Sequence, residues 1–178
     1  PQVFRAKTTF QSLARDATGA YYNTMCVLRD DEREGFYSPT FKRRLGGYTA
    51  ETVFREHAER AGTDDPLGLV QYIDYKTWLT GDINTKVDRA SMAHSLEVRE
   101  PLMDHLLIEW MARCPSSFKI RGGEGKWLLK RAYEPALPHD VLYRPKMGFS
   151  VPLARWLRGP LSSRTRAAVE GSRMLDTG

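Results

Sequence analysis

The sequence is poor in cysteine and histidine, and it has no long apolar run. Its two cysteines, Cys26 and Cys114, are too few and too isolated for a disulfide framework or a zinc site. We therefore expect a reducing, cytoplasmic environment. The four histidines have no metal-ligand spacing, which predicts no metal site. No apolar run approaches the roughly 18 residues that cross a bilayer, and Pro1–Phe10 has no apolar centre typical of a signal peptide, so we expect no membrane partner.

What the sequence does have is enough length and apolar content for a folded domain. Its 178 residues are 41% hydrophobic, which suits a globular protein with a core. The formal charge of +5 is compatible with an anionic ligand, but many enzymes carry as much. The basic residues are scattered over the predicted helices, without the arginine and aromatic interleaving of a nucleic-acid surface, so we expect no nucleic-acid partner.

Glycine, proline and apolar spacing divide the chain into short helices, which predicts a mainly α fold. Asp65-Pro66 is typical of a helix start, and Gly81 is typical of a helix end. We expect Leu96–Glu100 to be an extended link. The predicted helices span 49–61, 65–81, 82–94, 101–114, 126–133, 152–157 and 161–169, with another within 10–28 and a short strand at 117–121. A short segment is expected from Ser38-Pro39 to Gly46-Gly47, and four tryptophans are expected in the core: Trp78, Trp110, Trp127 and Trp156.

The extended link contains an acidic and a basic residue that alternate with apolar ones. Successive side chains of an extended segment point to opposite faces, so Glu97 and Arg99 are expected to share one face. A carboxylate beside a guanidinium in a cleft can act as a proton acceptor. The alternative is a structural ion pair that fixes the start of the next helix. The residues alone leave both interpretations open and favour the structural one.

A second candidate is the basic segment that contains Arg144 and Lys146. Pro145 constrains its backbone and Gly148 loosens it. A lysine is a compact charge that can approach a phosphoryl oxygen as negative charge develops there. The alternative is a solvated basic loop.

Four runs of residues, taken in order, resemble one known family. They are VDRASMAHSLEVREPLMD at Val87–Asp104, followed by Gly125–Arg131, Leu137–Phe149 and Val151–Leu157. Together they are similar to the C-terminal part of the synthetase domain of glutamine-hydrolysing, class B asparagine synthetases. The resemblance is strongest over Leu67–Gly159. It implies that residues 1–178 form a single partial domain. That domain is the helical C-terminal portion of an adenine-nucleotide α-hydrolase-like α/β domain, without its nucleotide-binding parallel sheet.

The resemblance also implies a chemistry. In this family ATP, with Mg²⁺, activates the side-chain carboxylate of aspartate as an acyl-adenylate, and glutamine-derived ammonia then displaces AMP. The position of Glu97 belongs to the acceptor site and to proton abstraction. The position of Lys146 stabilises the negatively charged transition states. For Arg99, Asp104 and Arg144 the resemblance implies supporting work, such as holding Glu97 or shaping the acceptor pocket.

The sequence departs from the family in what it omits. The phosphate-binding loop Ser-Gly-Gly-x-Asp-Ser and the later Gly-Glu-Gly-x-Asp-Glu loop are absent, and the chain begins Pro1-Gln2 instead of with the glutamine-attacking cysteine. We therefore expect a piece of a longer protein that lacks the glutaminase domain and the ATP-binding loop. Such a piece should bind no cofactor and be inactive alone. Its partner should be the N-terminal portion of its own chain, and an exposed apolar face would favour self-association.

Two alternatives remain open. Glu100 stands where the family usually has an apolar residue, which indicates a different acceptor neighbourhood. The acceptor could then be another carboxylate than that of aspartate. The second alternative is a helical binding module without catalysis.

Overall fold

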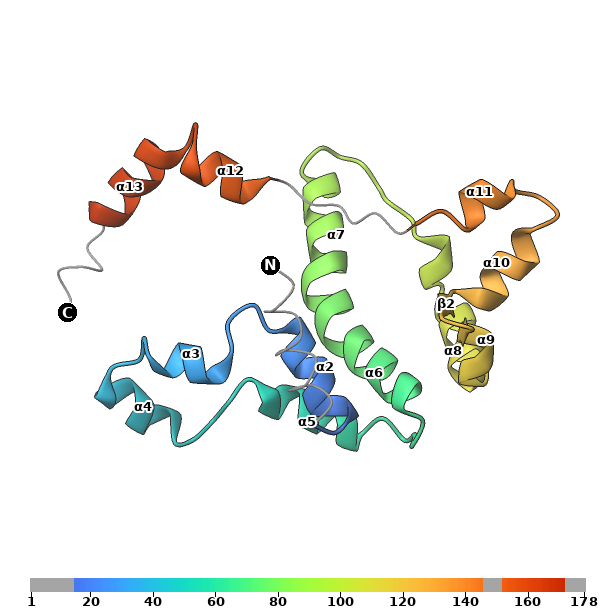
Figure 1. The fold of residues 1–178 in the computed structure, drawn as a ribbon, viewed down its shortest axis with the longest axis horizontal. Helices are drawn as coiled ribbons and strands as arrows, with labels where there is room; N and C mark the ends of the chain where they lie inside the picture. The colour runs from blue at the N-terminus through green and yellow to red at the C-terminus, as the bar shows by residue number, and fades with distance from the viewer. Residues whose placement is uncertain (1–14, 146–151, 172–178) are drawn as a thin grey trace. The chain divides into compact units, whose positions relative to one another are not determined.

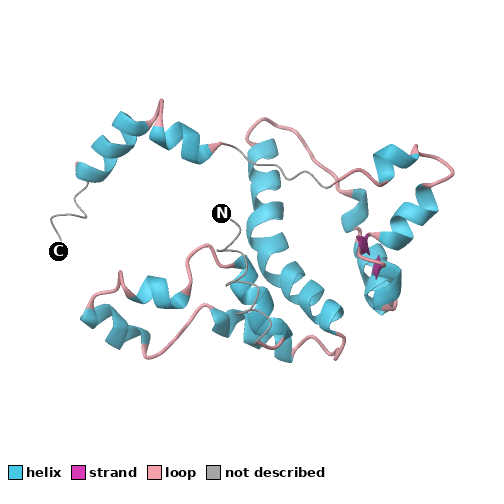
Figure 2. Ribbon diagram, viewed as in Figure 1, coloured by secondary structure: helices cyan, strands magenta, loops and turns pink. Residues whose placement is uncertain are grey.

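The computed structural model describes residues 15–145 and 152–171, which are mainly helical (Figure 1, Figure 2). This confirms the predicted fold class. By their internal contacts the residues divide into two compact units, Pro1–Leu128 and Leu129–Gly178. The assignment of residues 1–178 to a single partial domain stays a prediction. In the described part of the chain, no helix is both long and apolar enough to cross a membrane.

The core of the first unit lies among three helices: α2 (Ala17–Met25), α5 (Glu51–Glu59) and α6 (Pro66–Asp74). Tyr22 and Ile73 are the buried apolar residues of the described part, at 4% and 0% exposure. The ring of Phe54 lies 5.2 Å from the ring of Tyr22 and 5.9 Å from that of Tyr21, between centroids. Aromatic pairs in this range stabilise a core beyond the area that they bury.

Two short helices lie between α2 and α5, namely α3 (Asp30–Glu34) and α4 (Pro39–Leu45). The Ser38 hydroxyl caps α4 by accepting from the Phe41 amide at 3.2 Å, and Gly46 ends it in the left-handed conformation. The predicted segment is therefore confirmed at both ends. The predicted helix over 49–61 was expected to be capped by Thr49, and this is wrong, because α5 begins after Ala50 and has no side-chain cap.

The helix that begins at Pro66 continues much further than predicted. Asp65 caps it by accepting from the Gly68 amide at 2.6 Å. After α6 the chain continues as η1, a π-helix over Tyr75–Asn84, and then as α7 (Thr85–Met92). The predicted stop at Gly81 is wrong, because an interior glycine costs a helix only about 1 kcal/mol and does not by itself end it.

Threonine hydroxyls support the wide turns of η1. Thr80 donates to the Tyr75 carbonyl at 2.5 Å, and Thr85 donates to the Thr80 carbonyl at 2.9 Å. Both bonds span five residues, which is the spacing of the π-helix itself. These side chains therefore reinforce the register in which η1 joins α6 to α7.

The predicted helix from Pro101 is two helices. A single 3₁₀ turn, η2 (Pro101–Met103), precedes α8 (His105–Arg113). Asp104 separates them, because its carboxylate accepts from the amides of Leu106 at 2.9 Å and Leu107 at 3.3 Å and so starts a new helix.

A hairpin ends the first unit. The predicted strand begins late, because α9 (Ser116–Lys119) takes its first residues. β1 (Ile120–Arg121) pairs antiparallel with β2 (Glu124–Gly125), with Ile120 opposite Gly125. Gly122 and Gly123 form the turn with φ of +59° and +80°, which suits the two-residue hairpin turn that favours glycine.

The second unit begins within α10 (Trp127–Tyr133). It also contains α11 (His139–Leu142), α12 (Leu153–Arg158) and α13 (Ser162–Glu170). Glu134 joins the first two of these helices by accepting from the Tyr143 hydroxyl at 2.6 Å and from Arg131 at 2.5 Å.

The tryptophans do not form a core. Trp78, Trp110 and Trp156 are exposed, so for them that prediction is wrong. Helical periodicity identifies the apolar face of a helix, but burial also needs a second layer to cover that face.

Candidate functional site

The structure brings Glu97 and Arg99 together on the link that follows α7. Arg99 Nε donates to Glu97 Oε1 at 2.8 Å, so the two side chains share a face as the alternation predicted. Residues 96–100 form no helix or strand. The neighbouring apolar side chains, Leu96 and Val98, are exposed as well. The carboxylate is therefore accessible and oriented by one guanidinium.

Asp104 lies at the end of the same signature and has a structural role. Its Oδ1 accepts both amide hydrogen bonds at the start of α8. A carboxylate is also favourable at this end because the helix dipole is positive there. Asp104 thus fixes the direction in which α8 leaves the signature.

Arg144 lies in the second unit, exposed, directly after α11. Its neighbour Tyr143 is anchored, since the Tyr143 ring lies 5.2 Å from the Lys130 ammonium and its hydroxyl bonds to Glu134. Lys146 lies outside the described residues. The predicted roles of all five site residues remain predictions.

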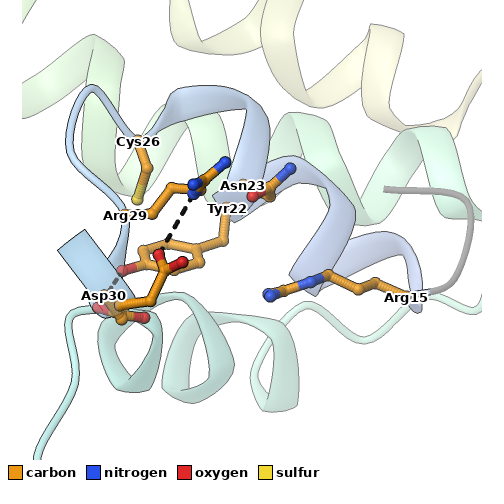
Figure 3. A pocket seen from close by; sticks show the side chains of 7 residues that line it. Arg15, Tyr22, Asn23, Cys26, Arg29 and Asp30 are labelled. Carbon is orange, nitrogen blue, oxygen red and sulfur yellow. Dashed lines mark hydrogen bonds and ion pairs between the residues drawn. The ribbon is translucent and has the colours of Figure 1, made fainter. Parts of the chain in front are cut away.

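A cavity of about 330 Å³ lies elsewhere, between α2 and α3 (Figure 3). Its lining residues are Arg15, Tyr22, Asn23, Cys26, Arg29, Asp30 and Asp31. Their charges are paired, partly outside the lining: Arg29 bonds to Asp31 at 3.3 Å, Arg15 to Glu51 at 3.5 Å and Asp30 to Arg33. Tyr22 also donates to Asp30 at 2.9 Å. Burial, and then hydrogen bonding, raise the pKa of the Tyr22 phenol. The phenol therefore remains a hydrogen-bond donor, and its bond to Asp30 links α2 to α3.

The described residues show neither a metal-binding cluster nor a phosphate-binding glycine loop. Among them no group of three acidic, histidine or cysteine side chains could hold a metal ion. The glycine pair Gly122-Gly123 forms the turn of a hairpin instead of a phosphate-binding loop before a helix.

Comparison with known proteins identifies the family. A family model described as asparagine synthase matches residues 3–177, beyond the range over which the sequence motifs are strongest. Glutamine-hydrolyzing asparagine synthetase 1 of Bacillus subtilis is 38% identical over 175 residues, which cover 97% of this chain and 27% of that protein. A Mycobacterium bovis protein that also carries a glutamine-hydrolyzing asparagine synthetase name is 47% identical over 102 residues, covering 57% of this chain and 16% of the relative.

A more distant relative has another name. Amidase chry2 of Gibberella zeae is 29% identical over 123 residues, covering 62% of this chain and 18% of that protein. No solved structure matches the chain. The chain spans between 16% and 27% of the length of these three relatives. With a family model that matches nearly every residue, the chain belongs to the asparagine synthase family.

Proposed function

We propose that this chain is the C-terminal part of the synthetase domain of an ATP-dependent amide ligase. The full-length enzyme would convert aspartate to asparagine through an aspartyl-AMP intermediate, with ammonia derived from glutamine. The observation that carries this proposal is the Val87–Asp104 signature in a family member, with Glu97 accessible and paired with Arg99 at 2.8 Å.

Glu97 and Arg99 would form the acceptor side of the reaction. An ammonia molecule that attacks an acyl carbon must lose a proton, and a carboxylate within hydrogen-bonding reach can accept it. Arg99 restricts the rotation of that carboxylate by holding one of its oxygens. The other oxygen is left for a substrate or a proton. Asp104 would keep the link and α8 in their relative direction.

Lys146 would supply positive charge to the same reaction. A lysine held near developing negative charge lowers the barrier by electrostatic stabilisation. We propose this role for Lys146 on the family motif alone. Arg144 would shape the acceptor pocket.

One observation favours a variant of this function. Glu100 is exposed and directly follows the Glu97–Arg99 pair, where the resemblance leads one to expect an apolar side chain. An additional carboxylate there changes the charge that an acceptor meets. The second candidate is therefore a ligase of the same class that amidates a carboxylate other than that of aspartate.

We also propose how the chain works in its protein. The isolated 178-residue chain would be inactive. It would need the remainder of the enzyme, which would bind ATP and Mg²⁺ and deliver ammonia. The enzyme would act in the cytoplasm.

The test is turnover by the full-length gene product. The purified protein is given ATP, Mg²⁺, glutamine and isotopically labelled aspartate, and asparagine, AMP and pyrophosphate are measured. We expect all three in equal amounts, and none from the 178-residue chain alone. A parallel reaction with ammonium in place of glutamine separates amidation from glutamine hydrolysis. Absence of AMP and pyrophosphate with aspartate and with a panel of other carboxylates would exclude the ligase.

A further inference from the structure

Ser95, directly before the acceptor link, has an unusual backbone conformation. Its φ is +56°, in the left-handed region that glycine adopts easily and other residues avoid. Among the described residues other than glycine, only Ser95 and Lys126 have a positive φ. A side chain in this region is held there by its surroundings, and such positions cluster at functional sites.

Two backbone hydrogen bonds hold Ser95 in place. The Ser95 amide donates to the Met92 carbonyl at 3.0 Å, and the Leu96 amide donates to the Ser91 carbonyl at 3.0 Å. This pair of bonds is the Schellman motif, which ends a helix and turns the chain in one direction. The signature therefore crosses from helix to link at a defined angle.

The helix that the motif ends is anchored in the core. α6, η1 and α7 run without a break from Pro66 to Met92, and Ile73 in α6 is fully buried. Threonine bonds reinforce the π-helical part, as described above. The packed part of the first unit therefore fixes the orientation of the helix from which the link starts.

Side-chain packing contributes little to the direction of the link itself. Leu96, Glu97, Val98 and Arg99 are all exposed, so no packed neighbour orients them in the described structure. On the α7 side of the link, what remains is the backbone at Ser95, two residues before Glu97. A serine there also restricts the backbone more than a glycine would.

We propose that Ser95 is a positioning residue for the ligase reaction. Its left-handed conformation sets the direction in which Glu97 leaves α7 and so places the carboxylate at the acceptor. This inference rests on the proposed function. Its first consequence is structural, however, and can be measured without any turnover.

The structural arm uses the 178-residue chain and amide hydrogen exchange. Ser95→Val places a β-branched side chain at positive φ and should open the motif, whereas Ser95→Gly keeps it. We expect exchange of the Leu96 amide to accelerate by about tenfold or more in Ser95→Val and to stay unchanged in Ser95→Gly. The Ile73 amide should be protected equally in all three proteins, which reports that the core is intact. Unchanged exchange at Leu96 in Ser95→Val would overturn the inference.

The functional arm uses the full-length gene product. Ser95→Val should raise the KM for the acceptor carboxylate by about tenfold or more, with the KM for ATP within about twofold of the original. In Ser95→Gly both KM values should equal those of the original protein. Lys126→Val is the matched control, because it strains the other positive-φ residue, outside the link, and should leave the acceptor KM unchanged.

The outcomes separate the two proposals. Faster Leu96 exchange with an unchanged acceptor KM in Ser95→Val would overturn the positioning role while the ligase stands. An equal rise in the KM for ATP would assign Ser95 a structural role and overturn positioning too. A full-length protein that forms no AMP from any carboxylate would overturn the proposed function and the positioning role with it, whatever the exchange result.

Discussion

Arg99 donates to Glu97 at 2.8 Å across one intervening residue, and the two side chains are 84% and 69% exposed. An ion pair this exposed is screened by water and adds little to folding stability. The structural interpretation from the sequence, in which the pair fixes the start of the next helix, predicts a loss of stability when it is broken. The functional interpretation predicts a higher KM for the acceptor when the pair is broken.

Replacement of Arg99 by glutamine separates the two. We expect Arg99→Gln to change the free energy of unfolding by less than about 0.5 kcal/mol, measured by urea denaturation of the 178-residue chain. In the full-length gene product it should raise the KM for the acceptor, because Glu97 loses its orienting partner. Arg166→Gln is the control, since it breaks the similarly exposed pair with Glu170 at 4.0 Å and should affect neither quantity. A clear loss of stability with an unchanged KM would favour the structural interpretation.

Lys146 should be needed for acyl activation. We expect Lys146→Ala to lower the rate of AMP formation by the full-length gene product by about 100-fold or more, because a positive charge near the developing negative charge is lost. Lys146→Arg should recover only part of the rate, since a planar guanidinium does not replace a compact ammonium. Circular dichroism must show the same helix content in all three proteins. Unchanged turnover in Lys146→Ala would remove this residue from the mechanism.

Asp65 should stabilise the first unit through two bonds. It caps α6 by accepting from the Gly68 amide at 2.6 Å, and it accepts from the Ser116 hydroxyl at 2.6 Å at the start of α9. We expect Asp65→Ala to lower the free energy of unfolding by about 1–2 kcal/mol, measured by denaturant titration.

Ser116→Ala is the matched variant, because it removes the second bond of Asp65 and leaves the cap. We expect it to cost about 1 kcal/mol or less, since that bond is exposed. If Ser116→Ala costs as much as Asp65→Ala, the cap contributes nothing.

Asp16 should make stability depend on pH. The hydrogen bond from Arg55, followed by that from the Gly19 amide, holds the pKa of the Asp16 carboxyl below its usual value. Because the pKa is lower in the folded state, the contribution of Asp16 is fully present above the unfolded pKa of about 3.9. It is lost as the pH falls through the folded pKa. Since the side chain is 59% exposed, we expect no more than about 1 kcal/mol.

The measurement is the thermal midpoint of the chain between neutral pH and about pH 3. Asp16→Asn should lower the midpoint at neutral pH and make the fall at acidic pH shallower. Asp64→Asn removes the same charge from another exposed aspartate and should leave the curve unchanged. An Asp16→Asn curve parallel to the original would refute this source of the pH dependence.

The isolated chain should self-associate through α8. Leu106 and Trp110 lie one turn apart on this helix and are 64% and 54% exposed, and Leu102 in η2 is exposed as well. Contiguous exposed apolar side chains favour association in water. We expect sedimentation velocity to show species that grow with concentration, and Leu106→Glu to reduce them. Val27→Glu, at an exposed position outside this face, should not. A chain that sediments as a monomer at every concentration would contradict the prediction.

The local features of the fold could be predicted from the sequence. Ser38-Pro39 and Asp65-Pro66 begin helices because a capping side chain and its target amide lie within three residues of each other. Gly46 ends α4 because a residue without a Cβ adopts the left-handed conformation at little steric cost. The pairing of Glu97 with Arg99 follows from the period of an extended chain. The resemblance places Asp104 in the site and does not indicate that its carboxylate caps α8.

The features that the sequence does not predict depend on contacts between distant residues or on the conformation of the backbone. Gly81 is typical of a helix end, yet the chain continues through it as a π-helix supported by Thr80 and Thr85. Nothing in the sequence distinguishes Ser95, because glycine or asparagine is the usual signal for its conformation. Helical periodicity assigned Trp78 and Trp110 to a core, but it cannot tell which apolar face is covered.

The sequence by itself determined the helical class of this protein, several of the caps, the Glu97–Arg99 pair and the family signature. Each depends on residues a few positions apart. Only the tertiary structure decided that Tyr22 and Ile73 form the core, and that α6, η1 and α7 are one helix ending at a left-handed Ser95. The core depends on contacts between segments distant in the chain, such as Tyr21 with Asp74 across 53 residues and Ser116 with Asp65 across 51. The continuous helix and its end at Ser95 depend on a local backbone hydrogen-bond pattern that the residue types do not specify. Burial and register are set by which surfaces meet, and local spacing does not specify that.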